Sequence, residues 1–373
     1  MNTSASCVLS SVRAKSSWPM VLSMPWRASC APANSRPDRP MAGQRLGEFE
    51  MIARYFAPLA ADAPGAFGLR DDAATIALPP GEEMVVTTDA MLEGVHFLLK
   101  DGAARIARKL LRVNLSDLAA KGARPIGYQL AIALPESLAT DEWLGTFCAG
   151  LAQDQKTFGI SLYGGDTVRS PDRLMLNVTA FGAVPAGTML RRDLAQAGDH
   201  LYVTGSIGDA ALGLETKLNH RLFSSAAMMF FDSRLHLPTP RLAFGQGLRG
   251  LAHAAMDVSD GLVQDAGHIA SASGLHAVIH AEAVPLSLAT RQAIADDKSL
   301  LSTVLTGGDD YELLFAAPPE AAQDVAALSS RVSLAVHRIG NLEAGSGVSV
   351  IDASGQPLGL ARGGFQHFGS TLE

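Results

Sequence analysis

The chain has 373 residues, of which 47% are hydrophobic and 18% are charged, and its formal net charge at pH 7 is −7. Such a length is enough to bury at least one large core, and it favours two domains. The negative charge argues against a nucleic-acid surface as the main function, and the lack of an apolar run of about 18 residues argues against a membrane span. Cys7, Cys30 and Cys148 show neither metal-ligand spacing nor a disulfide framework, which fits a reducing, cytoplasmic location.

Residues 1–40 differ in composition from the rest of the chain. They are rich in Ser, Pro and Ala, and their basic residues outnumber the single acid Asp38. The apolar stretch over 18–26 is interrupted by prolines, which makes it a poor core for a secretory signal. We expect a disordered or mis-started extension, with Met41 as the natural beginning of the folded chain.

From Gly47 onward, periodic patterns predict an N-terminal domain over 41–185. The stretch EFEMIARYFAPLA places Phe49, Ile52, Ala53 and Phe56 at helical spacing. The elements predicted after it are strands over 74–79 and 84–90, a helix over 105–122 closed by Gly122, a strand over 128–135, a helix over 142–159, a strand and turn over 160–167, and a strand over 174–184. Strands and helices alternate, so we expect an α+β mixed sheet layered by helices.

The chain passes into a second domain around Pro185, which we place at 186–373. Two stretches, HLYVTGSIGDAALGL and AAMDVSDGLVQDAGHIASASG, each predict a strand, a glycine turn and a helix. LHAVIHAEAVP predicts a strand, LTGGDDYELLFAAP predicts a tight turn before another strand, and PPEAAQDVAALSS predicts a helix with Pro near its start.

Six acidic residues share one local setting, at the end of an apolar strand or on the polar stripe of an apolar helix, next to Gly, Ser or Thr. They are Asp72, Asp89, Asp117, Asp166, Asp257 and Asp260. Each alone is compatible with a turn, a solvated helix face or an N-cap. Together they lie among small and apolar residues with few cations, where buried acids require a partner or a metal. Oxygen ligands without His/Cys spacing indicate Mg²⁺, which commonly shares its coordination with substrate phosphates.

The sequence contains no GxxxxGK[ST] phosphate loop, no HRD or VAIK kinase signature and no GxSxG elbow. The GSIGDA turn after the strand at 201–204 is a weak candidate for holding an anion at a helix N-terminus. A nucleotide would therefore be held through metal bridges. Asp257, Ser259 and Asp260 would then form one wall of a multi-metal phosphate site.

Eight motifs in order closely resemble those of the thiamine-monophosphate kinase family, within the aminoimidazole ribonucleotide synthetase superfamily. They are GEFEMIARYF, DDAA, TTDAMLEGVHF, VNLSDLAAKGA, GGDT, VTGSIGDAALGL, MDVSDGL and GGDDYELLF. The resemblance covers about residues 45–370. It implies a two-domain fold, a C-terminal α/β domain, and an N-terminal sheet that pairs with its copy in a homodimer, with ATP bound on the N-terminal domain near the subunit boundary.

The same resemblance implies an enzyme that phosphorylates thiamine monophosphate to thiamine diphosphate, with ATP as co-substrate and several Mg²⁺ ions. The matching Mg²⁺ ligands are Asp72, Thr87, Thr88, Asp89, Asp117, Asp166, Asp257 and Asp260. The matching nucleotide contacts are Gly165, Asp166, Arg192 and Ser259, with Arg191 as the alternative to Arg192. The matching contacts to the thiamine phosphate are His96, Asp309 and Phe365.

Asp309 departs from the family pattern, because the motif usually reads GGEDYEL. The shorter side chain loses a methylene of reach, so the substrate contact could instead pass through water or through Asp310. The acceptor is an ionised phosphate oxygen, and so neither a covalent nucleophile nor a general base is expected. Bringing two polyanions together in line requires divalent cations.

Several alternatives remain open at this point. The chain could be another ATP-using member of the superfamily, such as aminoimidazole ribonucleotide synthetase, a hydrogenase-maturation factor or selenophosphate synthetase. The last would want a reactive N-terminal cysteine, and Cys7 and Cys30 lie in the extension. A non-catalytic thiamine-phosphate-binding protein is expected to lose metal ligands, yet the acidic set is complete. His96 could be a loop histidine without a ligand, and Phe365 could serve C-terminal packing.

Overall fold

The computed structural model describes residues 47–218 and 220–360. The predictions for residues 1–40 and for Phe365 lie outside these ranges. In the described part of the chain, no helix is both long enough and apolar enough to cross a membrane.

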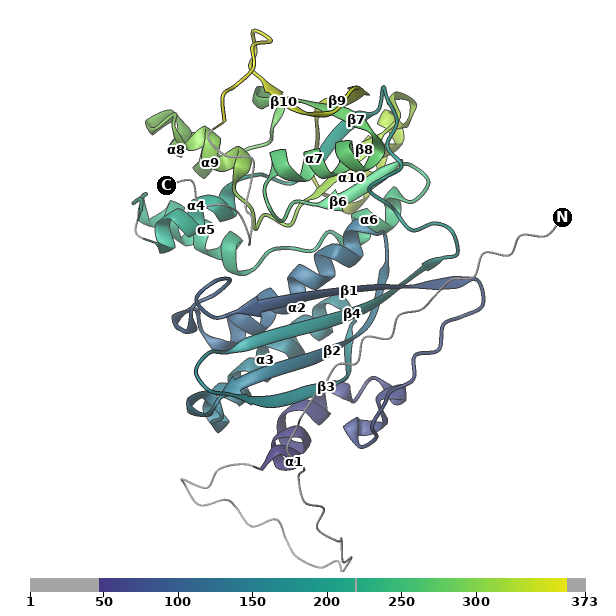
Figure 1. The fold of residues 1–373 in the computed structure, drawn as a ribbon, viewed down its shortest axis with the longest axis vertical. Helices are drawn as coiled ribbons and strands as arrows, with labels where there is room; N and C mark the ends of the chain where they lie inside the picture. Colours follow the sequence, from purple (N-terminus) through teal and green to yellow (C-terminus); the bar gives the residue numbers. More distant parts are fainter. Residues whose placement is uncertain (1–46, 219, 361–373) are drawn as a thin grey trace, which may run out of the picture. The chain divides into compact units, whose positions relative to one another are not determined.

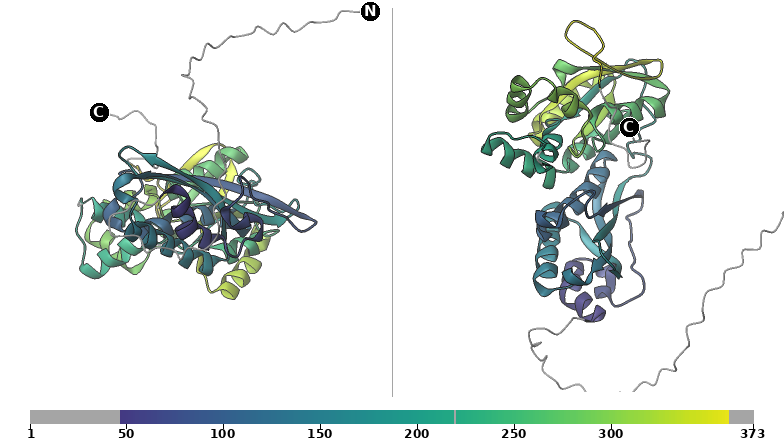
Figure 2. Two further views of the ribbon diagram at one scale, coloured as in Figure 1. Left: turned by 90° about the horizontal axis from the view of Figure 1, so that it is seen from below. Right: turned by 60° about the vertical axis from the view of Figure 1, so that its left-hand side comes forward.

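The first sheet is four-stranded and carries two long helices on one face (Figures 1 and 2). Its strands, in the spatial order β1-β4-β2-β3, are β1 (Glu82–Leu92), β4 (Met175–Pro185), β2 (Arg124–Pro135) and β3 (Ser161–Ser170). Only the β2–β3 pair is parallel. The helices are α2 (Ala103–Ala120) and α3 (Asp141–Phe158), and their apolar residues form one core with the inward side chains of the strands. Apolar periodicity placed both helices correctly, and Gly122, at φ 67°, ends α2 as predicted.

The segment before β1 differs from the prediction. In place of one regular helix, it forms α1 (Glu48–Met51), a π-helical turn (Ile52–Phe56) and two 3₁₀ turns (Ala57–Ala60 and Pro64–Leu69). A π turn holds more residues than an α turn, and so it rotates the residues on either side of it out of register. Phe56 is accordingly buried, whereas Phe49, predicted on the same apolar face, is 85% exposed.

The predicted strand over 74–79 is wrong, because this segment joins neither sheet. Its partly buried and exposed side chains do alternate as in a strand. The backbone N–H of Thr75 bonds the carbonyl of Gly65, 2.9 Å away, in the preceding 3₁₀ segment. A Cβ on Gly65 would lie 2.0 Å from the carbonyl oxygen of Thr75, so this close approach requires glycine.

The second sheet has six strands in the order β10-β7-β9-β5-β8-β6. They are β5 (His200–Thr204), β6 (Ala254–Asp257), β7 (Leu275–His280), β8 (Leu313–Ala317), β9 (Val336–Ala344) and β10 (Gly347–Ile351). The accompanying helices are α4 (Asp209–Lys217), α5 (Ser225–His236), α6 (Leu242–Leu248), α7 (Leu262–Ser273), α8 (Leu288–Asp296), α9 (Leu300–Thr306) and α10 (Ala322–Val332). The strands and helices predicted for this half are all present, whereas α5, α6, α8, α9, β9 and β10 were not predicted. Only the β10–β7 pair is parallel. Two mixed sheets with helices confirm the predicted fold class.

Helix α2 also packs against the second half of the chain. Ala119 and Ala120 share a buried cluster with Phe244 of α6 and Ala255 of β6. A Cβ on Gly245 of α6 would lie 1.9 Å from the carbonyl oxygen of Ala119, so only glycine permits this approach. Helix α2 therefore reaches from the first sheet to the end of β6, and this position brings its polar stripe to the candidate site.

Candidate active site

The polar stripe of α2 holds the end of β1. The Asn114 side chain donates to the carbonyl of Leu110 and accepts the backbone N–H of Asp89, at 2.9 and 3.1 Å. One turn away, the Thr87 hydroxyl donates to Oδ2 of Asp117 at 2.5 Å. Strand register turns Thr87 and Asp89 toward the helices, since they pair with the buried residues of β4. The buried amide of Asn114 and a partly buried hydroxyl bond from Thr87 therefore fix Asp89 and Asp117 beside one another.

The end of β6 meets the same stripe from the other side. Ser116 Oγ donates to Oδ2 of Asp257 at 2.6 Å, and both residues are buried. The turn after Asp257 runs beside the GGDDYE segment, since Tyr311 N–H bonds the carbonyl of Val258 at 2.8 Å and Asp309 N–H bonds that of Ser259 at 2.9 Å. Two motifs about fifty residues apart thus form one loop pair.

Asp89, Asp117, Asp257 and Asp260 interact electrostatically, and we call them the carboxylate cluster. Burial, and then the charges of Asp117 and Asp260, raise the pKa of Asp89 to about 6. Burial, and then Asp117, raise the pKa of Asp257 to about 8. Burial also raises the pKa of Asp117. These carboxylates lack sufficient positive charge, and all their donor atoms are oxygens, so the residues fit hard divalent cations.

Two cations lie close to the cluster. Lys121 Nζ donates to the carbonyl of Ala255 at 3.0 Å, and burial together with Arg192 lowers its pKa. Arg192 also acts on Asp117. The Arg191 guanidinium, by contrast, is engaged by Asp193 through two hydrogen bonds. The structure therefore favours Arg192 over Arg191 as the arginine that faces the cluster.

The remaining predicted metal and nucleotide residues lie on the opposite face of the first sheet. Asp72, Gly165 and Asp166 line a cavity of about 840 Å³ between that face and residues 48–74. Gly165 has φ 155°, and a Cβ there would lie 1.9 Å from the carbonyl oxygen of Leu130. Thr88 also points to this face, where it bonds Val178 and Thr179. The predicted ligands thus fall into an inner and an outer group with the sheet between them.

Asp309 accepts a hydrogen bond from a buried lysine. The Lys109 side chain is 5% exposed, and its Nζ lies 2.9 Å from Oδ2 of Asp309. The Tyr311 hydroxyl lies 3.2 Å from Oδ1 of Asp309. Asp309 and Tyr311 have φ of 70° and 53°, a region that costs energy for residues other than glycine. Tyr311 is in turn influenced by the charges of Asp89 and Asp257. The strained loop therefore holds Asp309 next to the carboxylate cluster.

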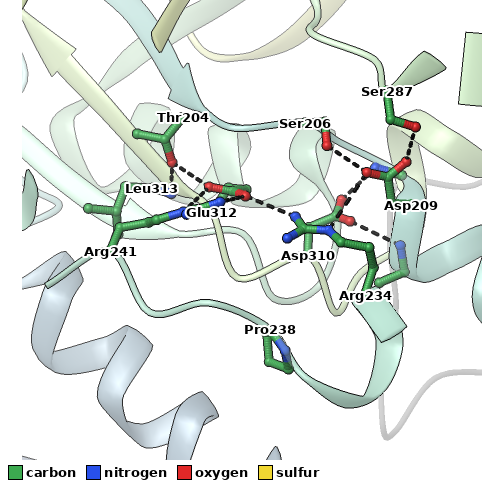
Figure 3. A network of polar contacts seen from close by, with 12 residues as sticks. Thr204, Ser206, Asp209, Arg234, Pro238, Arg241, Ser287, Asp310, Glu312 and Leu313 are labelled. Atoms are coloured by element: carbon green, nitrogen blue, oxygen red, sulfur yellow. Dashed lines mark hydrogen bonds and ion pairs between the residues drawn. The ribbon is translucent and has the colours of Figure 1, made fainter. Parts of the chain in front are cut away.

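Asp310 does not face the site, so the proposed contact from it to substrate is wrong. Its carboxylate is buried and accepts the backbone N–H groups of Gly208 and Ala210, at 2.6 and 3.3 Å (Figure 3). These groups belong to the GSIGDA turn at the start of α4. Asp310 thus occupies the helix terminus that was a candidate anion site, which leaves the turn unable to bind phosphate through these N–H groups.

Glu312 anchors the same loop in the interior. Figure 3 shows its carboxylate between Arg234 and Arg241, with Thr204 on the same side as Arg241. Arg234 Nη2, Arg241 Nε and Thr204 Oγ1 lie 2.9, 2.7 and 2.7 Å from its oxygens. Glu312 is 1% exposed. Side chains along the motif therefore alternate, with Asp309 toward the site and Glu312 held in a buried ion-pair network.

His96 lies in the turn after β1, where its Nδ1 accepts the backbone N–H of Leu92 at 3.0 Å. Sequence reasoning missed Ser116 and Lys109, which the structure places at the site, and Glu312, which anchors the GGDDYE loop from the interior. Ser116 lies within the quoted VNLSDLAA motif, and its small polar side chain next to Asp117 was the available signal. Lys109 was detectable as a lysine on the apolar face of α2.

The two halves match two family models in turn: AIR synthase related protein, N-terminal domain, over residues 70–184, and its C-terminal domain over 196–353. Solved HypE structures at 19–24% identity share this fold, with TM-scores of 0.64–0.68. The fold and the acidic site therefore define a two-domain AIR synthase-related protein.

Within that class, the chain belongs to the thiamine-monophosphate kinase family. It is 41% identical over 307 residues to the thiamine-monophosphate kinase of Caulobacter vibrioides, covering 81% of this chain and 86% of the relative. The crystal structure of the Stenotrophomonas maltophilia enzyme is also 41% identical, with a TM-score of 0.74 and coverage of 82% and 97%. AaThiL complexed with AMPPCP and TMP is 30% identical, with a TM-score of 0.69 and coverage of 88% and 100%.

Proposed function

We propose that this chain transfers the γ-phosphoryl group of ATP to thiamine monophosphate and so makes thiamine diphosphate. The observation that carries the proposal is the meeting of Asp89, Asp117 and Asp257, from β1, α2 and β6, in one partly buried cluster that lacks sufficient positive charge. Relatives of this chain carry the name thiamine-monophosphate kinase, and the structure of one, AaThiL, was solved in complex with AMPPCP and TMP. The acceptor is an already ionised phosphate oxygen, so the reaction requires no general base.

The carboxylate cluster and the outer group would hold several Mg²⁺ ions. The residues assigned to this role are Asp72, Thr87, Thr88, Asp89, Asp117, Asp166, Asp257 and Asp260. Bound Mg²⁺ would supply neutralisation of the two polyanions and alignment for in-line transfer. The chain's own contribution is positional: Ser116 and Thr87 orient carboxylate oxygens, and Asn114 fixes the β1 backbone.

We assign the nucleotide to the outer cavity and to the loop after β6, with Gly165, Asp166, Arg192 and Ser259 as contacts. Gly165 lines the outer cavity, and the close approach of the Leu130 backbone to it requires glycine at this position. The thiamine end is assigned to His96, Asp309 and Phe365. A carboxylate such as Asp309 is suited to a cationic thiazolium, and Lys109 would hold that carboxylate in place.

The outer face of the first sheet supports a homodimer. Val86, Val168 and Met175 expose 56%, 51% and 38% of their surface on strands of this face. Exposed apolar side chains on one face of a sheet are suited to pairing with a second copy, as the family resemblance implies. We further propose a domain boundary near Pro185 and a cytoplasmic location.

One assay tests the function. The purified protein, incubated with ATP, Mg²⁺ and thiamine monophosphate, is expected to form thiamine diphosphate, with ADP in equal amount. Asp257→Asn is the matched inactive control. ADP formation without thiamine diphosphate, or product formation that is unaffected in Asp257→Asn, would overturn the proposal.

A further inference from the structure

A second group of potential metal ligands lies at the start of α7, beside the carboxylate cluster. One oxygen each from Asp260 and Asp265 and one ring nitrogen of His268 all lie within 4.8 Å of one another. Three ligand atoms that each lie about 2.1 Å from one cation are about 3–3.6 Å from one another. Small side-chain rotations that close the separations by about 1–2 Å would therefore let the three atoms share one ion.

Asp265 supplies the independent sign of a missing ligand. Its Oδ2 accepts the backbone N–H groups of Ser259, Asp260 and Gly261, at 3.0, 3.2 and 3.2 Å. Its Oδ1 is buried, and among the described residues it has no hydrogen-bond partner. A buried carboxylate oxygen without a partner is costly. Since the turn saturates Oδ2, Oδ1 is the atom that remains for a cation.

The other two residues are arranged for the same ion. Gln264 Nε2 donates to Oδ2 of Asp260 at 3.1 Å, which orients that carboxylate and leaves its second oxygen for a ligand. His268 follows Asp265 by three residues on α7, so both project from one face of the helix. His268 is exposed, which gives an ion a path from solvent.

We propose that Asp260, Asp265 and His268 form a mixed oxygen and nitrogen site for a divalent first-row transition-metal ion. An imidazole ligand suits ions such as Fe²⁺, Ni²⁺ and Zn²⁺ better than Mg²⁺ and Ca²⁺, and Mn²⁺ is the paramagnetic probe used to detect the site. The proposal rests on the proposed function only in that Asp260 is also one of the assigned Mg²⁺ ligands. It adds two ligands outside that assignment and a preference for a different class of metal.

The test uses the full-length, chelator-treated protein with Mn²⁺ alone and without nucleotide. Pulsed electron paramagnetic resonance is expected to show ¹⁴N coupling to bound Mn²⁺. His268→Gln should abolish this coupling and weaken Mn²⁺ binding by about tenfold or more, since even outer-shell changes cost that much. His280→Gln, which changes a partly buried histidine at the end of β7, is the control and should keep the coupling. A wild-type spectrum without ¹⁴N coupling, or coupling that persists in His268→Gln, overturns the proposal.

A second variant addresses Asp265 itself. Asp265→Asn keeps an oxygen for the three turn N–H groups but removes the charge of the carboxylate. It should weaken Mn²⁺ binding while the melting temperature stays within a few degrees, and unchanged affinity would overturn the assignment. Nitrogen-coupled Mn²⁺ in a protein that forms no thiamine diphosphate would refute the proposed function alone. An active kinase without ¹⁴N coupling would refute this site alone.

Discussion

Ser116 Oγ on α2 donates a 2.6 Å hydrogen bond to Oδ2 of Asp257 at the end of β6, and this bond lowers the pKa of a carboxyl group that burial raises. The contact joins two residues 141 positions apart. Cation binding requires the ionised form of Asp257. The hydrogen bond from Ser116 favours that form, so a residue of α2 supports cation binding by a residue of β6.

Ser116→Ala should therefore raise the pKa of Asp257 and move the acidic limb of the activity profile to higher pH. A hydrogen bond to a charged group contributes about 1.5–3 kcal/mol, so kcat/KM near neutral pH should fall about tenfold or more. The measurement is kcat/KM against pH at saturating Mg²⁺. An unshifted limb would mean that Asp257 does not titrate in the profile.

The metal-free protein should become less stable as the pH rises from about 4 to about 8. In the folded protein the pKa of Asp257 is about 8 and that of Asp89 is about 6, and both lie above the ordinary value of 3.8. Between these values the folded state keeps protons that the unfolded state releases, so the free energy of unfolding falls as pH rises. Melting temperatures across this range, with and without Mg²⁺, check the prediction. Mg²⁺ should reduce the fall, and a flat apo curve would contradict it.

Asp89→Asn and Asp166→Asn should both abolish turnover but differ in stability. Asp89 is partly buried among other carboxylates, so its neutral amide should stabilise the apo protein above pH 6 by up to about 3 kcal/mol. Asp166 is exposed on β3, so its variant should melt within a degree of wild type. Chemical denaturation and the product assay measure both effects. Wild-type activity in either variant would refute its assignment as a metal ligand.

Asp309→Ala should weaken the use of thiamine monophosphate much more than that of ATP. It removes the carboxylate near the cationic thiazolium, a loss of about tenfold to a hundredfold in the apparent constant. It also leaves the buried Lys109 ammonium unpaired, so the melting temperature should fall. Asp309→Glu should preserve or tighten substrate use. Steady-state kinetics with each substrate varied in turn distinguish the outcomes, and equal losses for both would mean that Asp309 only shapes the turn.

Glu312→Gln should destabilise the protein by about 3–5 kcal/mol, because two guanidinium groups lose their buried partner. The displaced GGDDYE loop should also lower activity in the fraction that remains folded. Urea denaturation gives the free energy of unfolding. Glu343→Gln on β9, an exposed carboxylate, is the matched control and should change little.

Sequence reasoning succeeded where the information was local. Helix α2 was predicted over 105–122 and spans 103–120, because apolar periodicity and Gly122 specify it. The prediction of a strand over 74–79 was wrong. An alternating pattern of apolar and polar residues does not reveal whether a neighbouring strand is present to hydrogen-bond with the segment. The sequence also missed that Asp310 fills the α4 terminus about a hundred residues earlier, because the two meet only through the pairing of β5 with β8. The sequence grouped six acidic residues together, but the structure divides them between the two faces of the first sheet. That division depends on strand register, which local patterns do not reveal.

Four contacts of α2 reach four different partners: Lys109 bonds Asp309, Asn114 bonds the Asp89 backbone, Ser116 bonds Asp257 and Asp117 accepts from Thr87. Successive residues of an α-helix are rotated by about 100° around its axis. An alanine inserted after Ala107 would turn every later side chain by that angle relative to the segment before it. Composition, hydrophobicity and helix length would scarcely change, yet at least part of this set of contacts would be lost together. The rotation of α2 about its own axis therefore determines whether these four contacts, and with them the inner site, can form together.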